Sequence, residues 1–426
     1  MWPFLVFERK MSSNEIQSRN FRYHTIEGAL YISTTVALIS TQTVMPALIK
    51  RLGGGDVLIG TWPVVIYLAY FLPQVISANN SGAVQYRTPF VIKLGFIQRL
   101  HILLLACVIA LWGKSAPTLA LVFLFLLFIS NQMTSGSVSP VWMDFLAKTT
   151  SPENRGKLVG WRTSLGAVLG LVNGFILAVL LTIISFPYNY AAVIGLAFLY
   201  QMSSLVAQQK VIEEEPSAVS APVRLSELFE RMRFIVAGNR PFRMFLVASA
   251  LLTGSFTSVA FFTVAAMKRL DLSESSVGIF TVVTIIGQIF SGVVLGWVAD
   301  TKGTKSALLI CGISLLLSIV TALFAPSVIW FYFVFVFMGI NVGAEMSMRY
   351  NFAVECAPEG DRPMYVGIMN AWFAPVYLIS PFAGWLSAVH GYNFVFWLSL
   401  VIGSAGIILL AKTPDLRAEK LALSSK

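Results

Sequence analysis

Charged residues are scarce in this chain of 426 residues. Asp, Glu, Lys and Arg make up 12% of it, whereas apolar residues make up 57%. Soluble domains carry about 25% charged residues, and a chain with so few would have too little polar surface to stay dispersed in water. The stretches Ala191–Ala207, Val277–Ala299 and Val328–Asn341 contain no charged residue at all. The composition therefore predicts a protein embedded in a membrane.

Other absences exclude further classes of protein. The net charge of +10 is not gathered into a dense basic run with interleaved aromatics, so nucleic acid is not an expected partner. Cys107, Cys311 and Cys356 lie far apart, and the histidines fall on separate apolar segments, so neither a disulfide framework nor a metal site is indicated. The sequence has no phosphate-binding glycine loop for ATP and no clustered Ser, His and Asp or paired acids. It therefore predicts neither an enzyme nor a cofactor.

Apolar segments of the length that crosses a bilayer, roughly 20 residues, recur along the chain. They predict an all-α membrane protein with twelve transmembrane helices. The first six are His24–Leu48, Val57–Asn79, Phe90–Gly113, Thr118–Phe145, Gly160–Phe186 and Tyr188–Gln208. The second six are Phe242–Met267, Val277–Ala299, Thr304–Ala325, Val328–Tyr350, Met364–Val389 and Tyr392–Lys412.

One short passage occurs twice, at the same place in the two sets of six helices. The copies are PENRGKLVG at 152–160 and PEGDRPMYVG at 358–367, and Arg155 lies 207 residues before Arg362. That offset is close to half of the chain. Such a duplication is the usual architecture of a secondary transporter, with its site between the halves. It predicts two pseudo-symmetric six-helix bundles around a central cavity.

Lys and Arg lie mainly in alternate connections between the predicted helices. Most of the 30 basic residues fall on the side of both termini, and the opposite side holds only Lys50, Arg51, Lys114, Lys268 and Arg269. Cytoplasmic connections carry the excess of Lys and Arg in membrane proteins. The pattern predicts a multi-pass protein of the cell (inner) membrane with both termini in the cytoplasm.

Residues 209–241 form a polar linker between the predicted bundles at 24–208 and 242–412. Its stretch Leu225–Val236 is amphipathic, which predicts a helix along the inner membrane surface that tethers the halves. A solvated linker is the alternative for the part before Val223. Residues 1–23 and 413–426 are expected to be a cytoplasmic segment and tail, with either Met1 or Met11 as the start.

The connection after the eighth predicted helix reads GWVADTKGTK and contains Gly296, Asp300, Gly303 and Lys305. Gly296 would permit close helix approach, Gly303 would permit a tight turn, and Asp300 places an anion at the membrane edge. This passage resembles the loop signature of the major facilitator superfamily. In that family the acid engages the start of a helix in the other half while the outward-facing state is populated.

The resemblance implies a cytoplasmic latch. Asp300 would engage the start of the fifth helix, where Arg155 and Arg162 are nearest, and Arg362 opens the matching helix of the second half. Asp144 ends the fourth helix ahead of both arginines and is expected to form an ion pair that organises the loop. The equivalent connection in the first half, NNSGAVQYRTPF, has no acid, so a symmetric latch is not expected.

The tenth predicted helix carries three polar residues at steps of four. Asn341, Glu345 and Arg349 therefore share one stripe of the helix, and Glu before Arg is the favourable order for an ion pair. Charges inside apolar spans are costly, which makes them functional candidates. Helices 1, 4, 7 and 10 line the cavity in the major facilitator family, which implies that the stripe faces the pathway. A structural staple between neighbouring helices is the alternative.

Further polar side chains lie within the predicted helices. Glu27 is either a proton-binding acid or an interfacial residue near Arg22, and Arg99 is deep enough that we expect it to point inward to an acid or to carbonyls. Asn131 and Gln132 are neighbours, and because they point about 100° apart, at most one should face the cavity squarely. Asn370 and Trp372 are further candidates for the substrate pathway. They precede Pro375 and Pro381 in the eleventh helix, where a bend is expected.

Together these features predict a secondary active transporter that moves a small or amphipathic solute by alternating access. Proton coupling would use Glu27 or Glu345, with Arg349 as a gate or anion contact, in symport or antiport. The alternatives are efflux or flipping of a lipid-like compound and, in a different class, a non-transporting membrane receptor or scaffold. The expected partners are the solute, protons and membrane lipid, and a monomer is expected. Pro73-Gln74 and Gln98–Leu100 resemble a poorly characterised bacterial subgroup of the family, which implies no substrate.

Overall fold

The structure is a computed structural model that describes residues 12–80, 85–214, 216, 225–358 and 361–414. The regular elements in these ranges are all helices, which confirms the predicted fold class. Eleven helices in the described part are long and apolar enough to cross a membrane, and they correspond to the second to twelfth predicted helices. The segment predicted as the first transmembrane helix is more polar, and its helix is interrupted. Together with the other eleven it agrees with the predicted twelve.

The described residues of the first half form ten helical elements. They are α1 (Ser13–Ser33), η1 (Thr34–Leu38), α2 (Val44–Arg51), α3 (Asp56–Pro63), η2 (Val64–Leu68), α4 (Ala69–Asn80), α5 (Arg87–Trp112), α6 (Pro117–Lys148), α7 (Pro152–Ile183) and α8 (Tyr188–Gln208).

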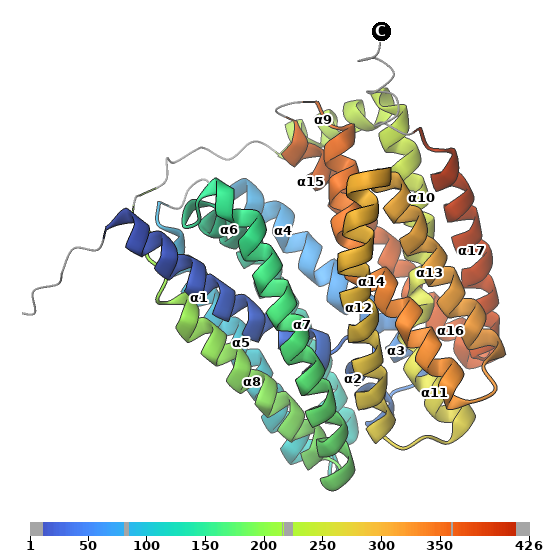
Figure 1. Cartoon of the computed structure of the whole chain (residues 1–426). Coiled ribbons are helices and arrows are strands. Elements are labelled where there is room, and N and C mark those ends of the chain that lie inside the picture. Colours follow the sequence, from blue (N-terminus) through green and yellow to red (C-terminus); the bar gives the residue numbers. More distant parts are fainter. Residues whose placement is uncertain (1–11, 81–84, 215, 217–224, 359–360, 415–426) are drawn as a thin grey trace, which may run out of the picture.

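The second half follows α9 (Leu225–Gly238). It consists of α10 (Arg240–Phe256), η4 (Thr257–Phe261), α11 (Phe262–Leu270), α12 (Ser275–Lys302), α13 (Thr304–Phe324), α14 (Val328–Cys356), α15 (Arg362–Phe373), η5 (Ala374–Ile379), α16 (Ser380–His390) and α17 (Tyr392–Lys412). Figure 1 shows the two bundles side by side, with the start of α1 and the end of α17 at the same end of the molecule. We call this the terminal end and the opposite one the distal end.

Local sequence explains where several helices begin and end. Ser12 caps α1, because its Oγ accepts from the N–H of Glu15 at 3.3 Å and its own N–H donates to the Glu15 carboxylate at 2.8 Å. The helix therefore begins well before the predicted start at His24. Gly303 turns the chain between α12 and α13 with φ of 89°, as predicted, and Gly391 does the same between α16 and α17 with φ of 82°. The alternative start at Met11 lies outside the described residues.

Four of the membrane-crossing paths change helix type part-way along. The turns are wider (π) in η1 and η2 and tighter (3-10) in η4 and η5. The segment η5 contains Pro375, where a bend is predicted, whereas the other three breaks are not predicted. All four lie where the halves meet: η2 packs against η5, η4 against α3, and η1 against α12. The contact between the halves is therefore built from locally irregular backbone.

The apolar cores show how the two halves are joined. The largest cluster of buried apolar residues lies toward the distal end and includes residues of both halves, such as Trp62 and Phe261. Toward the terminal end the cores are separate, around Phe145 in the first half and around Phe352 in the second. Figure 1 agrees, since α7 and α12 converge at the distal end and diverge at the terminal end.

The linker helix α9 lies at the terminal end, beside the start of α10 (Figure 1). Met232 and Ile235 pack against the core of the second half, which agrees with the predicted amphipathic face, and Arg231 forms an ion pair with Asp361. Phe234 is 80% exposed on the other side of the helix. The side chains of residues 225–229 lie outside the described part.

Candidate functional site

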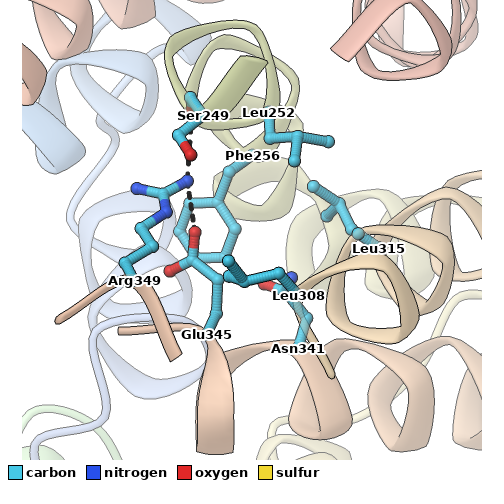
Figure 2. Close-up of a pocket in the computed structure, with 9 residues that line it drawn as sticks. Ser249, Leu252, Phe256, Leu308, Leu315, Asn341, Glu345 and Arg349 are labelled. Carbon is cyan, nitrogen blue, oxygen red and sulfur yellow. Dashed lines mark hydrogen bonds and ion pairs between the residues drawn. The ribbon is translucent and has the colours of Figure 1, made fainter. Parts of the chain in front are cut away.

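The stripe Asn341, Glu345 and Arg349 lies on one face of α14, inside the second half (Figure 2). Arg349 forms an ion pair with Glu345 and donates from Nη2 to the carbonyl oxygen of Ser249 on α10, at 3.2 Å. Its guanidinium also lies 4.5 Å from the ring centre of Phe373. The Arg349 side chain is 3% exposed and that of Glu345 is 23% exposed. The Arg349 cation is therefore fixed by its surroundings, while the Glu345 side chain is less enclosed.

The stripe lines a small cavity between α10, α13 and α14. Its volume is about 10 Å³, which is about the least that admits one water molecule. Asn341 donates from Nδ2 to the carbonyl oxygen of Cys311 at 3.0 Å, and its Oδ1 is buried without a partner among the described residues. In this conformation the cavity has room for a water molecule, but not for a larger solute.

A second small cavity lies between the halves. It has a volume of about 20 Å³ and shares Phe256 with the first cavity. Trp62, Tyr67 and Phe256 give it an aromatic lining, and Gln42 contributes an amide. Phe256 therefore separates the cavity beside the polar stripe from the cavity between the halves.

Glu27 is buried in the first half, paired with Arg162 of α7. Arg162 Nη1 lies 2.6 Å from Glu27 Oε2 and 2.9 Å from the carbonyl oxygen of His24, and the guanidinium lies 4.8 Å from the ring centre of Trp142. The side chains of Glu27 and Arg162 are 5% and 8% exposed. The placement of Glu27 at the water interface near Arg22 is therefore wrong, and Arg162 is already engaged within its own half.

Asn131 and Gln132 bond to different neighbours, as adjacent positions on a helix must. Asn131 donates to the carbonyl oxygen of Gln98 on α5 at 2.9 Å, and Gln132 donates to that of Ile66 in η2 at 3.3 Å. Arg99 is buried and donates to the carbonyl oxygens of Gln201 and Gly95. Of the two predicted alternatives for Arg99, carbonyls are therefore correct.

The two polar candidates of the eleventh path lie in α15. Asn370 is 7% exposed, with its Nδ2 at 3.5 Å from the hydroxyl of Tyr350, and its Oδ1 is buried with no hydrogen-bond partner in the described part of the chain. Trp372 is 40% exposed. Neither residue lines the two cavities near the stripe, so their place in the pathway stays a prediction.

Several of the latch residues are exposed or donate to nearby carbonyl oxygens in this conformation. Asp300 is exposed near the end of α12, and a Cβ added at Gly296 would meet no atom within 4 Å, so no helix approaches there. Arg155 donates to the carbonyl oxygens of Ala147 and Thr150, and Lys305 donates to that of Ala411 at 2.8 Å. Arg362 is exposed at the first residue of α15. Because the halves diverge at this end, the latch remains a prediction for another state.

Asp144 forms the expected ion pair, but with another partner. Arg87 Nε at the start of α5 lies 2.7 Å from Asp144 Oδ2, whereas Arg155 and Arg162 are bonded elsewhere. The expected pairing of Asp144 with the arginines of α7 is therefore wrong. The ion pair joins α5 to α6 instead.

Glu213, in the linker, is fixed to the first half, which is not predicted. Its carboxylate accepts from the N–H of Arg87 at 3.0 Å, from the N–H of Thr88 at 2.8 Å, and from Lys148 Nζ at 2.8 Å. Burial opposes ionisation, but these hydrogen bonds outweigh it and hold the pKa of the Glu213 carboxyl below its ordinary value. The start of the linker is therefore bound to the bundle instead of solvated.

Polar contacts close the distal end between the halves, and these too are not predicted. Asp56 of α3 accepts from the hydroxyls of Tyr392 at 3.0 Å and Ser387 at 3.2 Å. Glu274, just before α12, pairs with Arg51 Nε at 2.8 Å. Each acid lies close in sequence to basic residues of the predicted side that has few of them. That proximity is the sequence signal from which these contacts could have been predicted.

Backbone contact and aromatic stacking complete this distal closure. A Cβ added at Gly60 would lie 2.5 Å from the carbonyl oxygen of Ser380, and one at Gly384 would lie 2.5 Å from that of Asp56. The rings of Tyr67 in η2 and Tyr377 in η5 stack with their centres 4.1 Å apart. The two halves therefore touch backbone to backbone along α3 and α16.

Comparison with known proteins identifies a family and solved structures that resemble this chain. The family model described as Major Facilitator Superfamily matches residues 244–425. The crystal structure of the nucleoside transporter NupG aligns with a TM-score of 0.72 at 9% identity, over 94% of this chain and 100% of that chain. The second half of the chain therefore matches the major facilitator superfamily, and the chain as a whole has the fold of this solved transporter. The predicted resemblance is confirmed.

Other solved major facilitator neighbours show the same fold. A bacterial homologue of the iron transporter ferroportin, in an inward-facing state, aligns with a TM-score of 0.66 at 14% identity over 94% of this chain and 99% of that chain. A bacterial homologue of the human lysosomal transporter Spinster, inward-facing and unoccupied, gives 0.62 at 14% identity over 94% and 96%. No curated protein matches the chain. The superfamily and its transporter neighbours support solute transport.

Proposed function

We propose that this protein is a secondary active transporter that moves a small or amphipathic solute by alternating access. The observation that supports alternation is the asymmetry of the contact between the halves, which share a core at the distal end and have separate cores at the terminal end. The distribution of Lys and Arg assigns the terminal end to the cytoplasm of the cell membrane. On that assignment the described conformation is inward-facing, and the protein acts as a monomer.

Coupling to a proton gradient is assigned to Glu345. Its side chain is the less buried partner of a pair whose cation is buried and held by Ser249 and Phe373. Protonation of Glu345 would leave Arg349 without its counter-charge, and a buried charge without a partner is costly. An anionic or polar group of the solute could then bind Arg349 in place of the carboxylate, which links proton binding to solute binding.

The test measures flux in proteoliposomes with and without an imposed pH gradient, using a solute selected by thermal stabilisation from a broad library. We expect the wild-type rate to respond to the gradient and the rate of Glu345→Gln to be the same in both conditions. Glu355→Gln, on the same helix near the terminal end, is the matched control and should respond like the wild type. If Glu345→Gln responds fully to the gradient, the coupling role is wrong.

The aromatic lining between the halves favours an amphipathic solute, and so keeps efflux or flipping of a lipid-like compound as a second candidate function. Trp62, Tyr67 and Phe256 offer flat apolar surfaces, whereas Gln42 offers one polar contact. Such a site binds a ring or chain with a small polar group more strongly than a fully polar solute. The library should therefore pair each amphipathic compound with its polar fragment, and stabilisation by the fragment alone would contradict this solute class.

A further inference from the structure

A hollow of about 350 Å³ opens at the distal end of the second half, where α11, α16 and α17 meet. It is much larger than the cavities of about 10 and 20 Å³ described above, and the proposed transport cycle does not use it. The turn at Gly391 forms part of its wall. The side chains and backbone that line it belong to Ala265, Lys268, Arg269, His390, Gly391, Tyr392 and Asn393.

Arg269 supplies a fixed positive charge to this hollow. It donates from Nη1 to the carbonyl oxygen of Ala322 and from Nη2 to Asn393 Oδ1, each at 2.7 Å. Both acceptors are neutral, and no ion pair joins Arg269 to a carboxylate within the described residues. The guanidinium is therefore held in position without being neutralised.

Lys268 adds a second charge beside it. Its Nζ lies 5.6 Å from the ring centre of Tyr392, and the described residues again provide no carboxylate partner. Lys50 and Arg51, at the same end of the molecule, are by contrast paired with Asp56 and Glu274. Two adjacent cations that have only neutral contacts create a local positive potential that attracts an anion.

The nearest acids do not neutralise the hollow. Asp56 is engaged by Lys50 and by the hydroxyls of Tyr392 and Ser387. Asp271 follows Arg269 by two residues but is not among the lining residues, and its backbone is left-handed with φ of 50°. The imidazole of His390 can donate a further hydrogen bond, so the donors in the hollow suit a group with several oxygens, such as phosphate.

Exposed aromatic side chains adjoin the hollow on α13 and α17. The ring of His390 lies 4.8 Å from that of Phe394, and Trp397 pairs edge-on with Phe324 at 6.0 Å. Phe394, Trp397 and Phe324 are 44%, 50% and 65% exposed. Aromatic residues gather where a membrane protein meets the interface between lipid and water. A cationic hollow beside such a surface suits a ligand with an anionic group and an apolar part.

We propose that this distal hollow binds the phosphate group of an anionic phospholipid, with Lys268, Arg269 and His390 contacting the phosphate and the acyl chains lying along Phe394 and Trp397. Inorganic phosphate shares the headgroup chemistry and is the other source of the same ligand group. The site adjoins the distal closure, because Tyr392 contacts both the hollow and Asp56. It requires only that the protein lies in a membrane and does not depend on which solute is moved.

Native mass spectrometry of the full chain in detergent micelles tests this site. The probes are phosphatidylglycerol and phosphatidylcholine with identical acyl chains. We expect tighter retention of phosphatidylglycerol by the wild type and a loss of about fivefold in Lys268→Gln, the effect of one basic residue near an anionic headgroup. Lys268→Arg should keep the binding. Lys114→Gln removes an exposed basic residue of the same predicted side outside the hollow and should leave binding unchanged.

Inorganic phosphate, added alone in a second arm, distinguishes the two sources. Phosphate that stabilises the wild type against heat but not Lys268→Gln, without preferential phosphatidylglycerol binding, would assign the hollow to free phosphate. Retention of phosphatidylglycerol that excess phosphate does not reverse would assign it to the lipid. Equal retention of both lipids with no effect of phosphate, or an equal loss in Lys268→Gln and Lys114→Gln, would overturn the proposal.

Discussion

The buried pair of Glu27 and Arg162 illustrates how much one side chain can contribute to the stability of this protein. Both are nearly inaccessible to solvent, and their contact of 2.6 Å joins α1 to α7. We expect Arg162→Met to lower the free energy of unfolding by about 3–5 kcal/mol, because it leaves the Glu27 carboxylate buried and unpaired. Thermal unfolding of the purified variant measures this loss.

The double variant Glu27→Gln with Arg162→Met provides the control for that prediction. It removes both charges, so its melting temperature should be higher than that of Arg162→Met alone. Arg155→Met removes an arginine that donates to carbonyl oxygens at and just after the end of α6, and it should have a smaller effect. A double variant that melts below Arg162→Met would show that the charge pairing is not what stabilises this contact.

Glu213 gives a pH dependence whose sign follows from its lowered pKa. Because the folded state binds the proton more weakly than the unfolded chain does, the stabilisation is complete above the ordinary value of 4.5 and is lost as the pH falls below it toward the folded pKa. We expect the melting temperature of the wild type to fall over this range and that of Glu213→Gln to fall less. Glu214→Gln, one residue further along the linker, is the comparison. Parallel profiles for wild type and Glu213→Gln would contradict the assignment.

Some of these side-chain contacts were predictable and others were not. The shared stripe of Asn341, Glu345 and Arg349 follows from steps of four residues, since helical periodicity is a local property. Glu27 finds its partner 135 residues along the chain, and Asp144 finds one 57 residues back. Such pairings depend on how helices pack, and no spacing in the sequence encodes them.

Whole helices were easier to predict than their irregular turns. Crossing a bilayer requires a minimum apolar length, so the segments from Val57 to Lys412 could be placed from composition alone. The π-turns at η1 and η2 and the 3-10 turn at η4 lie where the halves pack together, and of these only η2 follows a proline directly. Tertiary contact, more than local propensity, therefore accounts for these breaks.

The packing of α3 on α16 leads to a prediction about the distal contact between the two halves. A Cβ at Gly384 would lie 2.5 Å from the carbonyl oxygen of Asp56, so Gly384→Ala should force the helices apart and open the distal closure. The reporter is the disulfide yield between Thr43→Cys and Thr281→Cys, whose native hydroxyl oxygens are 2.6 Å apart across the halves. Gly384→Ala should lower this yield severalfold.

Gly195→Ala is the matched control for this contact, because a Cβ at Gly195 would meet no atom within 4 Å. Its disulfide yield should equal that of the parent. The native Cys107, Cys311 and Cys356 are replaced beforehand in all of these variants. An unchanged yield in Gly384→Ala would mean that α3 and α16 adapt to the added methyl group without separating.

The molecule as a whole could be predicted as two six-helix bundles, but the end at which they meet could not. The duplicated passage at Arg155 and Arg362 indicates two related halves, and that relation does not depend on conformation. A protein that alternates between two states has one sequence for both, and the proposed latch residues would act in a state in which α7 and α12 meet at the terminal end. The described structure has the opposite contact, with Thr43, Asp56 and Glu274 at the distal end.

Locking that distal contact tests the proposed cycle directly. If transport requires the halves to separate at the distal end, oxidation of the Thr43→Cys and Thr281→Cys pair should abolish solute flux in proteoliposomes, because a covalent bond across the halves prevents the opening. A reductant should restore the flux, and each single-cysteine variant should transport equally before and after oxidation. The extent of crosslinking, measured on the same vesicles, must account for the fraction of flux lost. Full flux from a fully crosslinked protein would rule out alternating access through this end, and the solute would then have to cross by a route that leaves α2 and α12 in contact.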